Sequence, residues 1–167
     1  MLQERYGWLF VSVSDILRHE LGKRGMPIQR DNLHNLSAEW RRELGNAVLV
    51  DKALDIFNTF KAAGLVVASI RNPGEADRIH ELGGQIVWVD ADPKVRYERI
   101  HTRNRGTEDQ KTFEQFLAED EAEMHSSGDP ATLDMSAVKS RADIFMENNG
   151  DDVEAFKDAA AKALGLA

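Results

Sequence analysis

The chain has 167 residues, a length typical of one domain that buries a core without disulfides or metals. Its 21 Lys and Arg residues are outnumbered by 29 Asp and Glu residues, and the net charge of -8 disfavours nucleic-acid and membrane-surface partners. Cysteine is absent, which excludes disulfides and thiolate chemistry and fits a reducing compartment. No apolar run reaches the roughly 20 residues that cross a bilayer. We therefore expect a cytoplasmic protein with a single domain over residues 1–167.

Four short apolar runs are typical of strands that are buried on both faces of a parallel sheet. They cover residues 8–13, 65–70, 85–89 and 143–146. Helical patterns lie between these runs, and several begin at a capping sequence. The capping sequences start at Asn72, Asp92, Thr112 and either Asp151 or Asp152. Strands that alternate with helices predict a three-layer α/β/α fold with a parallel sheet.

Polar residues follow each predicted strand, where the ligand crevice of an open parallel sheet lies. They are Ser14, Asp15 and Arg18 after the first run, Arg71, Asn72 and Glu75 after the second, Asp90 and Asp92 after the third, and Asn148 after the fourth. An arginine beside a helix N-terminus can hold a phosphate, so Arg71 is the foremost candidate. Its alternative partner is a structural carboxylate such as Glu75. Ser14, Asp15, Asn72 and Asp92 also have the ordinary interpretation of helix caps.

A second basic group lies on one helical face, spaced by three and four residues. It comprises Arg96, Arg99 and Arg103, with Arg105 just beyond. Stacked like charges are unfavourable unless an anion or an acidic partner neutralises them. Several acids follow within one loop and helix, including Glu119, Asp120 and Glu123. Two interpretations of this basic group therefore remain, a phosphate clamp and a salt-bridged hairpin.

Five segments, in chain order, resemble the P-loop nucleoside and nucleotide kinases, with an adenylate-kinase-like arrangement. The resemblance is most specific to dephospho-CoA-kinase-like and deoxynucleotide-kinase-like proteins. The segments cover residues 12–18, 70–75, 89–99, 113–123 and 142–150. The resemblance implies ATP-dependent phosphoryl transfer, with Mg²⁺, to a small nucleotide or nucleotide-like acceptor.

The resemblance also implies roles for particular residues. Residues 14–64 would form the helical region that binds the acceptor, and residues 96–125 would form a lid-like region. The acceptor would be bound by Ser14, Arg18, Arg71, Asn72 and Glu75; Asp15, Arg99, Arg103 and Arg105 would be catalytic, and Asn148 would contact the cofactor. No metal ligand is assigned.

One departure from the kinase pattern changes the expected activity. The chain has no G-x-x-x-x-G-K-[ST] loop, because Gly22-Lys23 is followed by Arg24 and Leu17 stands at the first glycine position. Residues 2–6, followed by Gly7, look like the last turns of the helix that would come after that loop. We therefore expect impaired transfer and no tight binding of ATP or Mg²⁺. The alternatives are a non-catalytic nucleotide-binding or interaction module and a shortened or misread form of an active kinase.

The missing loop has a consequence for the sheet. In the kinases that this chain resembles, the strand before the loop lies between the strands that correspond to residues 65–70 and 86–89. Without it, two apolar strands face a gap with unpaired backbone groups. They could pair directly after a shift of about one strand spacing, 4.7–4.9 Å. We favour the other solution, in which a second copy fills the slot and produces a homo-oligomer.

Overall fold

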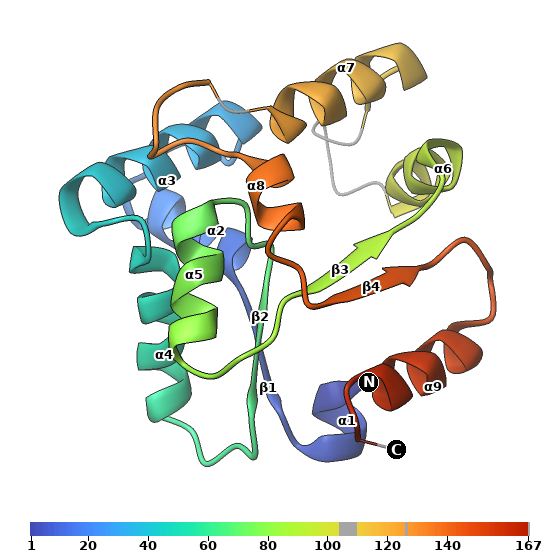
Figure 1. Ribbon diagram of the computed structural model, residues 1–167. Coiled ribbons are helices and arrows are strands. Elements are labelled where there is room, and N and C mark those ends of the chain that lie inside the picture. The colour runs from blue at the N-terminus through green and yellow to red at the C-terminus, as the bar shows by residue number, and fades with distance from the viewer. Residues whose placement is uncertain (104–109, 126, 167) are drawn as a thin grey trace.

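The computed structural model describes residues 1–103, 110–125 and 127–166, so the predicted catalytic residue Arg105 lies outside the described residues (Figure 1). The described strands are β1 (Leu9–Ser12), β2 (Leu65–Ala68), β3 (Val87–Asp90) and β4 (Ile144–Glu147). The described helices are α1 (Leu2–Tyr6), α2 (Val13–Lys23), α3 (Arg30–Leu44), α4 (Val48–Asn58), α5 (Pro73–Glu81), α6 (Pro93–Arg103), α7 (Phe113–Met124), α8 (Met135–Lys139) and α9 (Val153–Ala163). The predicted α/β fold with parallel strands and helical layers is confirmed.

The strands form two parallel pairs rather than one continuous sheet. β1 pairs with β2 from Leu9↔Leu65 to Ser12↔Ala68, and β3 pairs with β4 from Val87↔Ile144 to Asp90↔Glu147. Among the described residues no strand joins the two pairs, and Figure 1 shows them running in different directions. Direct pairing of β2 with β3, one of the two solutions considered above, is therefore not the arrangement observed.

The main apolar core lies on the β1–β2 side of the molecule. Residues from α2, α3 and α4 form one buried cluster, and Val67 of β2 packs against it. The cluster consists of Val13, Leu17, Leu21, Leu33, Leu36, Trp40, Val48 and Leu49. Its members recur at helical spacing, which directs one face of each helix toward the same interior. This core supports the carboxyl ends of β1 and β2.

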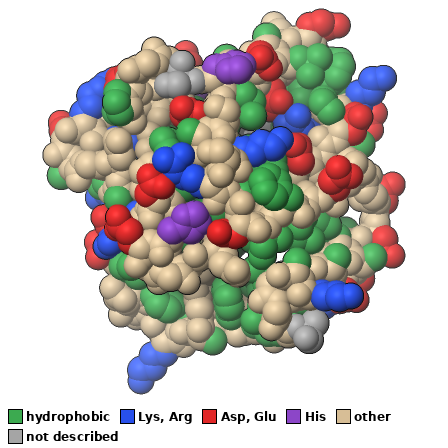
Figure 2. All heavy atoms as spheres, viewed as in Figure 1, with side chains coloured by type: hydrophobic (Ala, Val, Ile, Leu, Met, Phe, Trp, Pro, Cys, Tyr) green, Lys and Arg blue, Asp and Glu red, His purple; other side chains and the backbone are tan. Residues whose placement is uncertain are grey.

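The β3–β4 pair is less covered than its sequence predicts. Val89 is 50% exposed and Phe145 is 61% exposed. Because Trp88 is in register with Phe145 and Val89 with Met146, the two exposed side chains lie on opposite faces of the pair. The prediction that these strands are buried on both faces is wrong, because no described layer covers them fully. It is also wrong for β1 and β2, in which only Val11 is buried and Phe10 is 52% exposed. Figure 2 shows hydrophobic side chains around a hollow between the β3–β4 pair and α9.

Helix boundaries confirm most of the predicted caps. Asn72 and Thr112 each form a capping box, and Asp92 and Asp152 accept hydrogen bonds from the backbones of α6 and α9. Ser14 and Asp15 are not caps, because α2 starts one residue before Ser14 and Ser12 occupies the N-cap position. The short helix α8 was not predicted. Within the described parts of the chain, every helix is too short or too polar to cross a membrane.

Candidate functional site

A cavity of about 310 Å³ lies at the carboxyl ends of β1 and β2. Ser12 ends β1 and Ser69 follows β2, and both line the cavity together with residues of α2, α3, α6 and α7. Its described charged lining comprises Arg18, Arg30, Arg41, Arg71, Arg96, Arg103 and Lys111 against Glu119, Asp120 and Glu123. In a chain with a net charge of -8, this concentration of cations creates a local field that attracts anions.

Arg71 stands on a turn that a buried carboxylate holds in place. Glu75 Oε2 accepts the backbone N–H of Arg71 at 3.0 Å and that of Asn72 at 3.2 Å. Glu75 Oε1 accepts Nη2 of Arg41 at 2.6 Å, and both side chains are almost fully buried. Glu75, the alternative partner considered for Arg71, therefore binds the backbone of Arg71 and not its guanidinium. The ion pair of Glu75 is with Arg41. A buried pair of this kind costs several kcal/mol to break on one side, roughly 3–5.

The segment before α8 completes this support. The buried Asn72 side chain donates to the carbonyls of Pro130 and Thr132, each at 2.8 Å. Arg71 accepts the N–H of Asp134 through its carbonyl at 3.0 Å. On the opposite side, a Cβ at Gly74 would lie 2.5 Å from Cβ of Asn46, so only glycine fits the close approach of the turn to the loop before α4. The Arg71 backbone is thus fixed on several sides.

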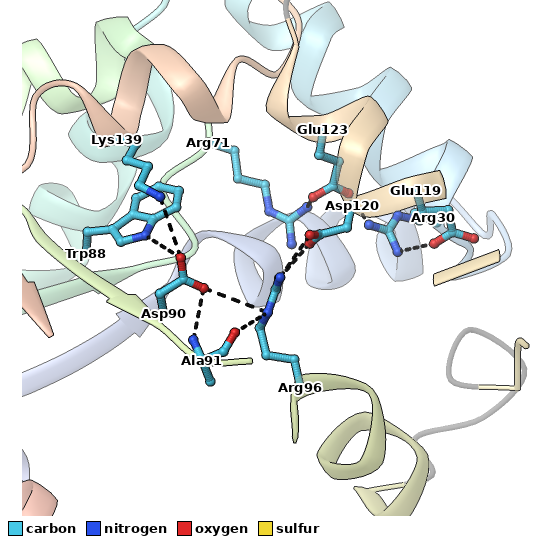
Figure 3. Close-up of polar contacts among 10 residues, drawn as sticks. All are labelled: Arg30, Arg71, Trp88, Asp90, Ala91, Arg96, Glu119, Asp120, Glu123 and Lys139. Carbon is cyan, nitrogen blue, oxygen red and sulfur yellow. Dashed lines mark hydrogen bonds and ion pairs between the residues drawn. The ribbon is translucent and has the colours of Figure 1, made fainter. Parts of the chain in front are cut away.

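The Arg71 guanidinium faces helix α7 (Figure 3). Its Nη1 lies 2.6 Å from Oε2 of Glu123, and Nη2 of Arg30 binds the other carboxylate oxygen. Burial raises the pKa of Glu123, but the charges of Arg71 and Arg30 outweigh it and hold the pKa below its ordinary value. Glu123 is therefore an ionised carboxylate held between two arginines that line the cavity.

Arg96 makes a second contact with α7. Its Nη1 and Nη2 lie 2.7 Å and 3.0 Å from the two oxygens of Asp120, a bidentate pair (Figure 3). Nε of Arg96 donates to the Ala91 carbonyl at 3.0 Å and lies 3.8 Å from Asp90 Oδ1. Of the two open interpretations, the salt-bridged hairpin is the one observed for Arg96.

Asp90, at the end of β3, lies behind Arg96. Its carboxylate accepts the backbone N–H of Ala91 at 2.9 Å and the indole N–H of Trp88 at 3.3 Å, and Lys139 Nζ lies 3.6 Å away. Burial raises the pKa of Asp90, but these donors and charges outweigh the effect of burial and hold the pKa below its ordinary value. The carboxylate is therefore ionised. Charges of alternating sign therefore extend from Lys139 through Asp90 and Arg96 to Asp120 (Figure 3).

The remaining predicted acceptor residues divide between the cavity wall and its support. Ser14 and Arg18 line the cavity. Asn72 and Glu75 belong to the support of the Arg71 turn described above. Among the predicted catalytic residues, Arg103 lines the cavity, whereas Asp15 is outside the lining and forms a 3.1 Å ion pair with Arg18.

Arg99 and Asn148 contact each other and do not line the cavity. Arg99 Nη1 donates to the Asn148 carbonyl at 2.5 Å, and its Nη2 donates to the Gly150 carbonyl at 2.7 Å. The Asn148 backbone N–H donates to the Asp90 carbonyl at 2.8 Å. These contacts join α6 to the loop after β4. Neither residue contributes to the cavity lining.

Several lining residues were missed by sequence reasoning, and four of them are instructive. Arg30 and Lys111 carry no local signal, because each lies next to rather than within a periodic segment. Arg41 falls on the apolar stripe of α3 beside Trp40, and a charge on that stripe is a signal for a paired, buried arginine. Ser69 has φ 69°, a left-handed conformation that costs a non-glycine residue on the order of 1 kcal/mol and is frequent at binding sites.

The described residues hold no group of three or more His, Asp or Glu side chains arranged to bind a metal ion. The arrangement instead offers guanidinium groups from separate elements around one cavity. Such groups bind carboxylates and phosphates through paired N–H donors.

No family model matches the chain. Individual relatives do, over most of its length. A UPF0200 protein of Pyrococcus abyssi is 31% identical over 160 residues, covering 92% of this chain and 81% of the relative. One of Pyrococcus horikoshii is 32% identical over 151 residues, covering 87% and 77%. One of Methanococcus maripaludis is 28% identical over 160 residues, covering 94% and 83%. The identity and coverage of the two Pyrococcus proteins show that this chain belongs to the UPF0200 family.

Proposed function

We propose that the cavity binds the phosphate group of a small nucleotide or nucleotide-like ligand, with Arg71 as the main anchor. The observation that carries the proposal is the gathering of six arginines and a lysine, among the described residues, around one cavity of an acidic chain. Arg41 is buried in its pair with Glu75, so the other five arginines and the lysine are the cations that a ligand could contact. Its volume of about 310 Å³ falls at the lower end of the range for small-molecule pockets, roughly 300–1,000 Å³. Its position at the carboxyl ends of parallel strands is where α/β folds bind ligands.

Arg71 is suited to the anchoring role because its backbone is already held. Glu75 and Asn72 hold the turn before any ligand arrives, so less conformational entropy is lost on binding. Arg18 and Ser14 line the same cavity and would contact the ligand from α2. This assignment corresponds to the acceptor site in the kinases that the sequence resembles, with residues 96–125 as the lid-like region.

ATP and Mg²⁺ are the donor and the metal that the kinase resemblance implies, and the residues of this chain do not fit them. Its sequence lacks a Gly-rich loop with a following Lys-Ser or Lys-Thr pair. Asn148, the residue assigned to the cofactor, has its backbone N–H and carbonyl engaged by Asp90 and Arg99. No step is therefore derived through the donor. Phosphate binding is common to an acceptor-binding kinase-like protein and to a non-catalytic nucleotide-binding module.

The proposal is tested by titration calorimetry with a panel of nucleoside monophosphates. Loss of a charged bidentate contact in Arg71→Ala should weaken binding by roughly 1.5–3 kcal/mol. Arg78→Ala is the matched control, because Arg78 pairs with Asp51 and Glu81 away from the cavity lining. Equal affinities of the parent chain and Arg71→Ala would overturn the site assignment.

A coupled assay with ATP and Mg²⁺ separates the two versions of the function. We expect turnover of the 167-residue chain at the background level, because each missing donor of transition-state charge stabilisation costs about 10²–10³ in rate. Phosphorylation of a monophosphate well above background would establish catalysis by this chain and contradict the expectation.

A further inference from the structure

Helix α7 presents its acids to the cavity along one side. Glu119, Asp120 and Glu123 each pair with cations that line the cavity. These cations come from α3, from the turn after β2, from α6 and from the segment before α7; they are Arg30, Arg71, Arg96 and Lys111. The helix therefore brings to these cations the kind of negative charge that a phosphorylated ligand would bring.

Glu123 has the surroundings of a bound anion. Arg71 contacts one of its carboxylate oxygens and Arg30 contacts the other, and His34 Nε2 lies 3.8 Å from it. Only 16% of the Glu123 side chain is exposed. A carboxylate and a phosphate use the same N–H donors of a guanidinium, so both cannot occupy these donors together.

The two ends of α7 are held by different forces. Phe113 and Phe116, at its start, pack against Tyr97 of α6 with ring centroids 5.3 Å and 5.8 Å apart. Phe116 is the only buried residue among the twelve of α7. Glu123, near the other end, is held through charged groups. Charge pairs can exchange partners without exposing an apolar core, so the Glu123 end can leave the arginines while the aromatic end remains packed.

We propose that Glu123 is an internal occupant of the phosphate position, and that an incoming oxyanion binds Arg71 and Arg30 by replacing this carboxylate and releasing that end of α7. The inference rests on the proposed function, since it concerns the same cavity. It adds that the ligand-free chain is self-inhibited: a ligand must provide more favourable charge interactions than a side chain that is already in place.

The test uses inorganic phosphate as the probe and begins with four forms of the full chain. Glu123→Gln keeps the shape of the side chain and removes its charge, so phosphate should bind about tenfold tighter than to the parent. Glu123→Asp keeps the charge and should remain within about threefold of the parent. The control is Glu121→Gln on the same helix: Glu121 is 74% exposed and pairs with His125, and the substitution should change nothing.

A double variant identifies the route of the effect. If Glu123 competes through Arg71, the gain of Glu123→Gln should largely disappear in the Arg71→Ala background. In the parent chain, saturating phosphate should accelerate amide hydrogen exchange at the end of α7 and leave α4 unchanged. Exchange in Glu123→Gln without phosphate should already be faster there.

Several results would overturn the inference: no phosphate binding to any form, equal or weaker binding to Glu123→Gln, or slower exchange in α7 on phosphate addition. The proposed function fails in a different way. In that case Glu123→Gln gains affinity for inorganic phosphate, but nucleoside monophosphates bind the parent no better than phosphate alone.

Discussion

The two strand pairs have nearly the same kind of sequence and very different surroundings. The β1–β2 pair packs against α2 and α4, and the main buried cluster lies on that side. In the β3–β4 pair no strand residue is buried, and helix α6 contributes no buried residue either. In the β1–β2 pair only Val11 is buried and Phe10 is 52% exposed, so the contrast lies in the buried helices packed against this pair rather than in the strands themselves. Continuous apolar runs therefore indicate which segments become strands, whereas burial depends on which layers are present to cover them.

The difference also bears on the proposed ligand site. The β1–β2 side holds Arg71 on a turn that hydrogen bonds of Glu75 and Asn72 fix in place. The β3–β4 side provides Asp90 and the start of α6, which reach the cavity edge through Arg96. Arg71 is thus held in place on the β1–β2 side, whereas Arg96 stands on the less buried β3–β4 side. This combination suits a site that adjusts around a ligand.

The largest expected effect is on the buried pair in the β1–β2 region. Glu75→Gln leaves Arg41 without its counter-charge, and we expect a loss of unfolding free energy of roughly 3–5 kcal/mol in urea titrations. Asp77→Asn is the comparison, because Asp77 is half exposed in its pair with Arg141 and the expected loss is about 0–1 kcal/mol. Equal losses would mean that the buried frame does not stabilise this region more than a surface pair.

Truncation of one valine in each region compares the contribution of burial to stability in the two regions. Val50 is 1% exposed in α4, and Val89 is 50% exposed in β3. Val50→Ala should cost about 1.5 kcal/mol, from the roughly 0.8 kcal/mol per buried methylene-sized group. Val89→Ala should cost about half of that or less in dilute solution. A larger loss at Val89 would contradict the uncovered state of β3.

The strand edges that have no partner strand among the described residues lead to a prediction about self-association. We expect light scattering to show a mass that rises with concentration, because unpaired strand edges and exposed apolar side chains favour pairing with another chain. Val89→Lys should weaken this association about tenfold, since a charge would be placed where apolar contact is expected. A monodisperse monomer at all concentrations would contradict this prediction.

The smallest effect concerns pH and the start of the β3–β4 pair. The backbone N–H of Ile86, followed by His80, lowers the pKa of Asp143 below its ordinary value of 3.8. A lowered pKa in the folded state stabilises the fold above pH 3.8, and the contribution is lost as the pH falls through the lowered value. Unfolding free energies of the parent and Asp143→Asn should therefore differ at pH 6 and converge toward pH 3. A difference that grows on acidification would contradict this sign.

Local sequence signals predicted the strands, most of the helices and one side chain of the cavity lining, Arg71. The capping box at Asn72 is a contact within four residues, so the pattern contains both partners. Arg71 was predicted from its place between a strand end and that cap. The partner of its side chain was not, because Glu123 lies 52 residues away and several neighbouring acids could have served. Long-range choices of this kind depend on how helices pack.

Burial was the other limit of sequence reasoning. Arg41 is 3% exposed although it is charged, because Glu75, Ser37 and a carbonyl satisfy its donors. Val89 is half exposed although it is apolar, because the layers around β3 are incomplete. In both cases the residue type predicts the average environment, and the tertiary contacts determine the actual one.

Recognition of a phosphate group by the cavity beside Arg71 can be tested on the unmodified chain by comparing two ligands. The chain is titrated by calorimetry with a nucleoside 5′-monophosphate and, separately, with the same nucleoside. The two ligands differ only in the phosphate group. We predict that the monophosphate binds at least about tenfold tighter, the contribution of about one charged contact, roughly 1.4 kcal/mol. Equal affinities, or tighter binding of the nucleoside, would contradict phosphate recognition by this cavity.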